Sequence, residues 1–358
     1  MHETDLRLEP NEASDLARVL DAGERARRGW DRAFLTVLDE AHAEDALALL
    51  SHRAGAPLDD GWEARRLRTT VTPSGAAGRT EDAEACAVRG GVAYVLGSQF
   101  GKKTGPLAAR RSWIARLPEA ALARAADGER VELEVARLRF ALHRAVNDAL
   151  EAAAVEPIAL GPLARRAYLD ATIELGAAKG KRWAGRVRSG DRPINVEALE
   201  FRADGRALLG LRYPVTADGH PILVELADVD ALFDDPDAVP AVGGIWVLAD
   251  VGDRAAPAGV RALDTRGDDR FDAVVGDLDA SGKSATVLED HPEGAVAPSR
   301  HVRFSLPLLA SGGDVATEEV HHFGDLRRVE GIAVDDEGHA HFVLDEEGHV
   351  ALRTLVVE

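Results

Sequence analysis

Hydrophobic and polar residues alternate with a period of two in pairs of short segments along the chain. Three pairs share an acidic residue, a small residue, an alternating run, a turn and a second alternating run: EACAVRGGVAYVLGS from Glu84, EALEFRADGRALLGLR from Glu197 and EGIAVDDEGHAHFVLDEE from Glu330. Alternation of this kind around a turn glycine is typical of β-hairpins. The pattern therefore predicts three similar hairpins.

Two weaker copies extend the series. DLARVLDAG with FLTVLDEA starts at Asp15, and VRALDTRGDDRFDAVVGDLD carries Arg261 where the other copies carry an acid. The starting residues Asp15, Glu84, Glu197, Arg261 and Glu330 follow one another at intervals of 69, 113, 64 and 69 residues. One interval is long, and the others are nearly equal.

The long interval contains the strongly helical part of the chain. In ARLRFALHRAVNDALEAA, leucine, alanine and valine recur at steps of three and four, and PLARRAYLDATIELGAAKG follows with a proline start and a glycine stop. We expect a helical hairpin at residues 138–182. Without it the repeat is regular along the whole chain.

Each repeat has room for two further strands after its hairpin, and in the fourth these are SATVLED or HVRFSLPLL, followed by EEVHHF. A regular repeat of four-strand size indicates a β-propeller. We predict a single all-β domain over residues 1–358 with five blades, six being the fallback, and with the helical hairpin inserted between the second and third blades. TDLRLEP near the amino terminus is expected to supply the strand missing from the last blade and so to close the ring. The alternative is a β-sandwich with a helical appendage.

Several of these segments resemble a known family. INVEALEFRADGRALLGLRYP (194–214) resembles the Asn-Ile-Glu-Gly-Leu-Ala and Gly-Leu-Arg-x-Pro signatures of the bacterial domain-of-unknown-function family numbered 3616, and EDAEACAV, GVRALD and VEGIAV resemble three further segments of it. Gln99, Phe100 and Ala262 depart from its pattern. The resemblance implies a propeller-like β fold and brings no established activity.

Charge narrows the classes of partner. The chain has 43 Lys and Arg against 62 Asp and Glu, a net charge of −19, so nucleic acid and anionic membranes are disfavoured. The single cysteine, Cys86, leaves no internal disulfide and is expected to be a buried packing residue. The amino terminus shows no signal-peptide pattern and no long apolar run appears, so we expect a cytoplasmic protein.

The stretch VAYVLGSQFGKKTG superficially resembles a phosphate-binding loop. Gly97 and Gly101 are separated by three residues, and Lys102 is followed by Lys103 and not directly by Thr104, so the P-loop spacing is absent. Two of the five lysines of the chain nevertheless lie here. We interpret the stretch as a strand and a turn whose lysines help an anion to approach.

In a propeller, equivalent positions of the innermost strands form a ring around the channel. The ring predicted here is Asp15, Glu84, Glu197, Arg261 and Glu330. The second strand of each hairpin adds Asp39 with Glu40, Ser98, Arg212, Asp277, and Asp345 with Glu346. Carboxylates that converge in this way are hard ligands for Ca²⁺ or Mg²⁺, and arginines can hold an anionic group.

From this ring we predict two overlapping sets of site residues. The ligand-binding set is Glu84, Ser98, Lys102, Lys103, Glu197, Arg212, Arg261 and Glu330. The metal-binding set is Glu84, Asn195, Glu197 and Glu330. His339 and His341 share one strand face, which we interpret as exposed and polar.

Three functions are consistent with these residues. The first is binding of a small ligand or a divalent cation at an acidic, arginine-bearing channel mouth. The second is metal-dependent hydrolysis of a phosphoester or lactone there, for which the sequence identifies no catalytic residue. The third is an interaction scaffold whose charges are purely structural. The apolar face of the helical hairpin would pack on the rim, cover the mouth or bind a protein partner or a second copy.

Overall fold

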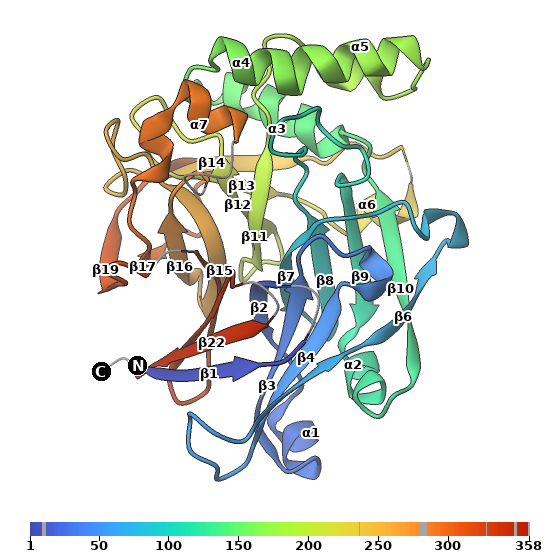
Figure 1. Cartoon of the computed structure of the whole chain (residues 1–358), viewed down its shortest axis with the longest axis vertical. Helices are drawn as coiled ribbons and strands as arrows, with labels where there is room; N and C mark the ends of the chain where they lie inside the picture. The colour runs from blue at the N-terminus through green and yellow to red at the C-terminus, as the bar shows by residue number, and fades with distance from the viewer. Residues whose placement is uncertain (9–11, 236, 280–284, 327, 347–348, 357–358) are drawn as a thin grey trace.

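The computed structural model describes residues 1–8, 12–235, 237–279, 285–326, 328–346 and 349–356. Within these ranges the fold is all-β with a few helices, and its strands form five sheets (Figure 1). In order from its innermost strand, the first sheet consists of β2 (Ala13–Arg18), β3 (Trp30–Leu38), β4 (Leu47–Arg53) and β5 (Trp62–Arg66), and the second of β7 (Ala83–Arg89), β8 (Val92–Gly97), β9 (Trp113–Pro118), β10 (Arg130–Arg137) and β6 (Arg68–Thr72). The third consists of β11 (Asn195–Phe201), β12 (Ala207–Tyr213), β13 (Ile222–Leu226), β14 (Val242–Leu248) and β18 (Gly312–Val315). The fourth consists of β15 (Gly259–Gly267), β16 (Arg270–Gly276), β17 (Arg300–Ser305) and β19 (Thr317–His322), and the fifth of β20 (Val329–Val334), β21 (Ala340–Leu344), β22 (Val350–Leu355) and β1 (His2–Leu6).

All five predicted segment pairs form antiparallel neighbours in these sheets. The β15–β16 turn uses Asp268 and Asp269, both at positive φ, where three other hairpins use glycine. The first pair is joined through helix α1 (Ala22–Arg27) and not through a tight turn. SATVLED, one of two candidates for a strand of the fourth repeat, instead contributes helix α7 (Thr286–Asp290), and the other candidate, HVRFSLPLL, overlaps β17.

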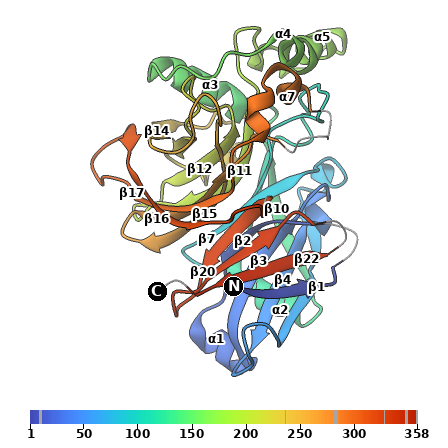
Figure 2. The same cartoon turned by 60° about the vertical axis from the view of Figure 1, so that its left-hand side comes forward.

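The innermost strands lie side by side near the middle of the molecule. Each makes its main contacts with the innermost strands of two other sheets, in the cyclic order β2, β7, β11, β15, β20 and back to β2. Strand β1 pairs antiparallel with β22, so the first and last described strands belong to one sheet, and the two lie side by side in Figures 1 and 2. The predicted amino-terminal partner strand is therefore present.

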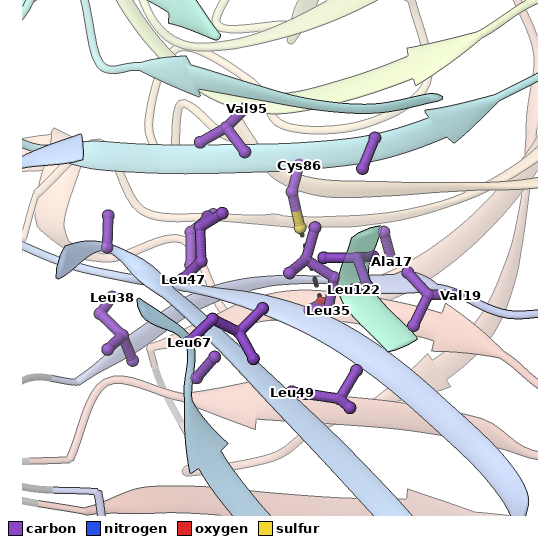
Figure 3. Close-up of a cluster of buried hydrophobic side chains, with 14 of the residues drawn as sticks. Ala17, Val19, Leu35, Leu38, Leu47, Leu49, Leu67, Cys86, Val95 and Leu122 are labelled. Carbon is purple, nitrogen blue, oxygen red and sulfur yellow. Dashed lines mark hydrogen bonds between the residues drawn. The ribbon is translucent and has the colours of Figure 1, made fainter. Parts of the chain in front are cut away.

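The core between the first and second sheets shows why the sheets stack. Cys86 on β7 points into a cluster that includes Leu35, Leu47 and Leu122, and its Sγ lies 3.6 Å from the Leu35 carbonyl oxygen (Figure 3). Cys86 is fully buried, and burial raises the pKa of its thiol well above the usual value. Its expected role as a small packing residue fits these contacts.

Helices occupy the ends and edges of the sheets. The remaining α-helices are α2 (Glu119–Ala126), α3 (Ala141–Ala152), α4 (Pro162–Ala164), α5 (Ala171–Ala178) and α6 (Ala231–Asp234). α3, α4 and α5 follow β10 and precede β11, and a π-helical segment, Arg165–Asp170, joins α4 to α5 at the top of the view in Figure 1. In the part of the chain described here, no helix combines the length and apolar character needed to cross a bilayer.

Gly331 allows two innermost strands to approach closely. A Cβ at this position would lie 2.9 Å from the Asp15 backbone on β2 and 2.5 Å from Val343 Cγ2. The equivalent positions of the second, third and fourth sheets carry Ala85, Ala198 and Ala262, whereas the first carries the larger Asp15. The glycine thus accommodates the neighbouring aspartate.

We expect Gly331→Ala to destabilise the protein by about 1–3 kcal/mol, because the methyl group must push the backbone of β2 away. Urea unfolding followed by tryptophan fluorescence measures the change. Gly75→Ala is the matched control, since a Cβ there meets no atom within 4 Å. Equal stability of the two variants would contradict this account of the contact.

Candidate functional site

A pocket of about 470 Å³ opens where four of the innermost strands converge. Glu84 on β7, Glu197 on β11, Arg261 on β15 and Glu330 on β20 all line it. The sequence predicted that these four residues would meet, and the structure brings them together. Lys102, Lys103, Asn195 and Arg212 line the same pocket.

A β-bulge positions each of these four side chains. The pairing of each innermost strand with its neighbour shifts by one residue, and Glu84, Glu197, Arg261 and Glu330 are the residues passed over by the shift. A bulge leaves one residue unpaired and redirects its side chain, which is why bulges recur next to functional sites. The repeated bulge directs one side chain from each of four strands toward the same pocket.

The first sheet differs from the prediction by one residue. Its bulge lies at Ser14, so Ser14 and not Asp15 occupies the position equivalent to Glu84. Asp15 is fully buried between strands, where its carboxylate accepts hydrogen bonds from the Leu16 and Cys86 backbone N–H groups at 2.8 and 2.9 Å. Because a shift of one residue exchanges the two faces of a strand, Asp15 does not line the pocket.

Three carboxylates form a compact group on one side of the pocket. Asp39 follows β3, Asp82 precedes β7 with φ at +68°, and one oxygen of each, together with one of Glu84, lies within 4.8 Å of the others. An arginine side chain contacts this group: Arg111 Nη1 lies 2.8 Å from Asp82 Oδ2. Glu84 had been predicted as a metal ligand, whereas Asp39 had been predicted only as a channel residue and Asp82 not at all.

Burial and repulsion between neighbouring acids raise the pKa values of all three acids in this group. Burial, followed by the charge of Asp82, raises the pKa of Asp39 to about 8. Burial raises the pKa of Asp82 to about 6 against the opposing effect of Arg111, and burial with the charges of Asp39 and Asp82 raises the pKa of Glu84 well above its usual value. A bound divalent cation would relieve this repulsion.

The opposite side of the pocket is an arginine–carboxylate network. Glu197 contacts Arg212 through Oε1 at 2.7 Å and Arg261 through Oε2 at 3.0 Å. Arg261 also lies 3.3 Å from Asp277 and forms an ion pair with Glu330. Asn195 donates to Glu197 Oε1 at 3.0 Å.

The arginine–carboxylate network engages three of the four residues that the sequence predicted as metal ligands. Glu197 and Glu330 are engaged by arginines, and Asn195 donates to Glu197. Of the four residues predicted to bind a metal, Glu84 alone belongs to the compact carboxylate group. Pairing with Arg212 and Arg261 could not be distinguished from metal ligation by sequence spacing.

The lysine loop borders the pocket without forming a phosphate loop. Lys102 and Lys103 are exposed and line the pocket, and within the described ranges neither forms an ion pair. A Cβ on Gly101 would lie 2.3 Å from the Pro106 carbonyl oxygen, so this glycine permits a close approach of the loop to itself. Ser98 is buried, donates to Asp82 and does not line the pocket.

The helical insertion holds this loop in place. The Tyr168 hydroxyl is hydrogen-bonded to the Lys103 carbonyl oxygen, and the Leu107 N–H donates to Thr172 Oγ1 at 2.9 Å. Among the described residues of the insertion, none lines the pocket. The helices therefore hold the lysine loop at the edge of the pocket.

A second carboxylate–histidine group lies in the last hairpin turn. Asp335, Glu337 and His339 have ligand atoms within 4.8 Å of one another, but Arg32 pairs with Asp335 at 2.6 Å and with Glu337 at 2.8 Å. His341 is fully buried and its Nε2 lies 3.1 Å from Asp335 Oδ2. The interpretation of His341 as an exposed strand residue was wrong, because its ring packs against Phe34 and Trp62 of the first sheet.

Deeper carboxylates lie between the innermost strands. Glu200 accepts from the Thr265 N–H at 3.2 Å and Asp264 accepts from the Val334 N–H at 3.0 Å, so each links its strand to the next sheet. Burial, followed by the charge of Asp264, raises the pKa of Glu200 to about 8. Burial raises the pKa of Asp264 to about 7 against the effect of Arg18.

These shifts make stability depend on pH. Between the pKa of the unfolded chain, near 4, and about 7 to 8, the folded protein holds protons on Asp264 and Glu200 that the unfolded chain has released. The free energy of unfolding therefore falls as pH rises through this window, by about 1.4 kcal/mol per pH unit for each such group, and levels off above it.

Asp264→Asn should reduce this slope between pH 5 and 7 by about 1 kcal/mol per pH unit, since asparagine has no proton to release. Urea unfolding at a series of pH values measures it. A slope unchanged from that of the wild type would contradict the assignment.

Comparisons with known proteins give a distant structural similarity. No family model matches the chain, and no curated protein matches it. Among solved structures, a GH43 endo-arabinanase from Bacillus licheniformis aligns with a TM-score of 0.41 at 11% identity, covering 98% of this chain and 96% of that one. An exo-1,5-α-L-arabinanase from a bovine ruminal metagenomic library gives 0.35 at 12% identity, covering 96% and 92%. The WD40 β-propeller domain of Doa1 gives 0.35 at 9% identity, covering 97% and 94%. At these TM-scores we draw no functional conclusion from the similarity.

Proposed function

We propose that the five sheets are the blades of a five-bladed propeller closed by β1, and that its channel mouth binds a divalent cation. The cyclic contacts of the innermost strands and the β1–β22 pair support the propeller. The family resemblance of the sequence implies the same architecture, and membership of that family is part of the proposal, as is a cytoplasmic location.

The observation that carries the cation site is the close approach of Asp39, Asp82 and Glu84. Carboxylate oxygens are the preferred ligands of Ca²⁺ and Mg²⁺, and these three acids, whose pKa values are raised in the unliganded protein, would release their protons to a bound cation. Water would complete the coordination shell on the pocket side.

The cation would prepare the pocket for an anionic small ligand. Arg212, Lys102 and Lys103 line the pocket, and the two lysine ammonium groups form no ion pair within the described ranges. An anionic group of the ligand would bridge the cation and these basic side chains. Without the cation, the acidic side of the pocket would repel such a ligand.

Thermal unfolding with Ca²⁺, Mg²⁺ or a chelator tests the cation site, because a ligand that binds only the folded state raises the melting temperature saturably. Phosphoesters, lactones and sugar acids are then added with and without the cation. We expect stabilisation by the cation alone and further stabilisation by an anionic compound only in its presence. Turnover of a compound would establish the hydrolase, whereas no shift with any cation would favour the scaffold.

A further inference from the structure

Four arginines lie on neighbouring segments of the second sheet and its connections, and none of them lines the channel-mouth pocket. They are Arg79, Arg110, Arg137 and Arg139. Their segments are joined through the main chain: the Glu81 N–H donates to the Arg110 carbonyl oxygen at 3.1 Å, and the Leu138 and Arg139 N–H groups donate to Ser112 O at 2.9 and 3.3 Å. The cluster is therefore fixed by backbone contacts and not by its own side chains.

The positive charge of this cluster is poorly balanced. In the part of the chain that the structure describes, the Arg79, Arg137 and Arg139 side chains form no hydrogen bond or ion pair, and Nε of Arg137 is buried without an acceptor. Glu81 is the nearby acid, and it is shared between Arg110 at 3.5 Å and Arg111 at 3.6 Å. Burial lowers the pKa of Arg137, and the charges of Arg139, Arg79 and Arg110 lower it further.

The turn that carries Arg139 is held in an unusual backbone conformation. Arg139 has φ at +48°, a left-handed region that few non-glycine residues adopt. Arg186 supports the turn by donating to the carbonyl oxygens of Leu138 and Arg139 at 3.0 and 3.2 Å, and so brings a fifth guanidinium close to the cluster. A chain with a net charge of −19 thus concentrates cations where they repel one another.

Such an arrangement suits a ligand with several phosphate groups. A guanidinium presents paired N–H donors that match two phosphate oxygens, and two arginines can engage one phosphate. Four arginines therefore match two adjacent phosphates, which would also supply the missing acceptor for Arg137. We propose that Arg79, Arg110, Arg137 and Arg139 form a binding site for a small oligophosphate-bearing molecule.

Calorimetric titration with inorganic triphosphate tests this site, with a chelator present so that no cation occupies the channel-mouth pocket. The wild type is expected to bind one triphosphate per chain. Arg137→Met should weaken binding at least about tenfold, because it removes one guanidinium group with its paired N–H donors. Arg182→Met is the matched control: Arg182 is exposed and pairs with Asp237 at 3.1 Å, so the same charge is lost elsewhere.

The melting temperature of Arg137→Met in the absence of triphosphate gives a second readout. Because Arg137 is repelled by its neighbours, Arg137→Met without triphosphate should melt at the same temperature as the wild type or higher, which separates lost binding from lost folding. Arg79→Gln, on an exposed loop, should weaken binding in the same direction. Absence of saturable binding to the wild type, equal binding by Arg137→Met, or saturable binding of a single-stranded oligonucleotide but not of triphosphate would overturn the proposal.

Discussion

Replacing Arg261 with methionine is expected to lower the free energy of unfolding by about 3–5 kcal/mol. Arg261 is 2% exposed and contacts Glu197 on β11, Asp277 directly after β16 and Glu330 on β20. Removing one partner of a buried ion pair leaves the others charged, unpaired and out of water, and this cost exceeds the loss of the attraction itself.

Denaturant unfolding of three variants separates this effect from simple loss of packing. Arg212→Met should cost less, because Arg212 is less buried and Arg261 remains to balance Glu197. Adding Glu197→Gln to Arg261→Met should recover part of the loss, since one uncompensated charge disappears. A loss below about 1 kcal/mol for Arg261→Met would show that the network contributes little to stability.

Unlike Arg261→Met, Glu84→Gln is expected to leave the free energy of unfolding of the unliganded protein unchanged or higher, and to weaken the response to cation. Glutamine replaces a carboxyl group whose ionised form is disfavoured by burial and by the charges of Asp39 and Asp82, so the free protein should be at least as stable as the wild type. The same change removes a charged ligand, and cation affinity should fall about tenfold or more, because the number of ligand charges tunes affinity at such sites.

Thermal unfolding across a Ca²⁺ or Mg²⁺ titration measures both effects in one experiment. Glu63→Gln on β5 is the matched control, because it makes the same chemical change at an exposed position. Full cation stabilisation of Glu84→Gln would remove Glu84 from the site. A large loss of stability in its unliganded form would instead identify Glu84 as part of a structural network.

Much of the fold could be predicted because its signal is local. The period-two alternation around Gly91, Gly205 and Gly338 marks hairpins directly, and the nearly equal spacing of the five starting residues, once the helical insertion is left out, indicates a repeat. The strand considered at SATVLED was wrong, because a short apolar run does not distinguish a strand from a helical turn. The β1–β22 pair was recovered because the last repeat contains too few strands.

The site was predicted less completely because it depends on register and on loops. Alternation identifies the β2 strand but not the bulge at Ser14, and one residue of shift moves Asp15 from the pocket into the interior. Asp82 lies before β7 in a left-handed conformation, which no periodicity reveals. Its one signal was an acid two residues ahead of Glu84, in the segment EDAEACAV.

Anomalous diffraction from crystals soaked in Mn²⁺ tests the central claim most directly, since Mn²⁺ takes the oxygen ligands that suit Ca²⁺ and Mg²⁺. We expect an anomalous peak between the carboxylates of Asp39, Asp82 and Glu84. Density at Asp335, Glu337 and His339 alone, or no bound ion at the channel mouth at saturating Mn²⁺, would contradict it.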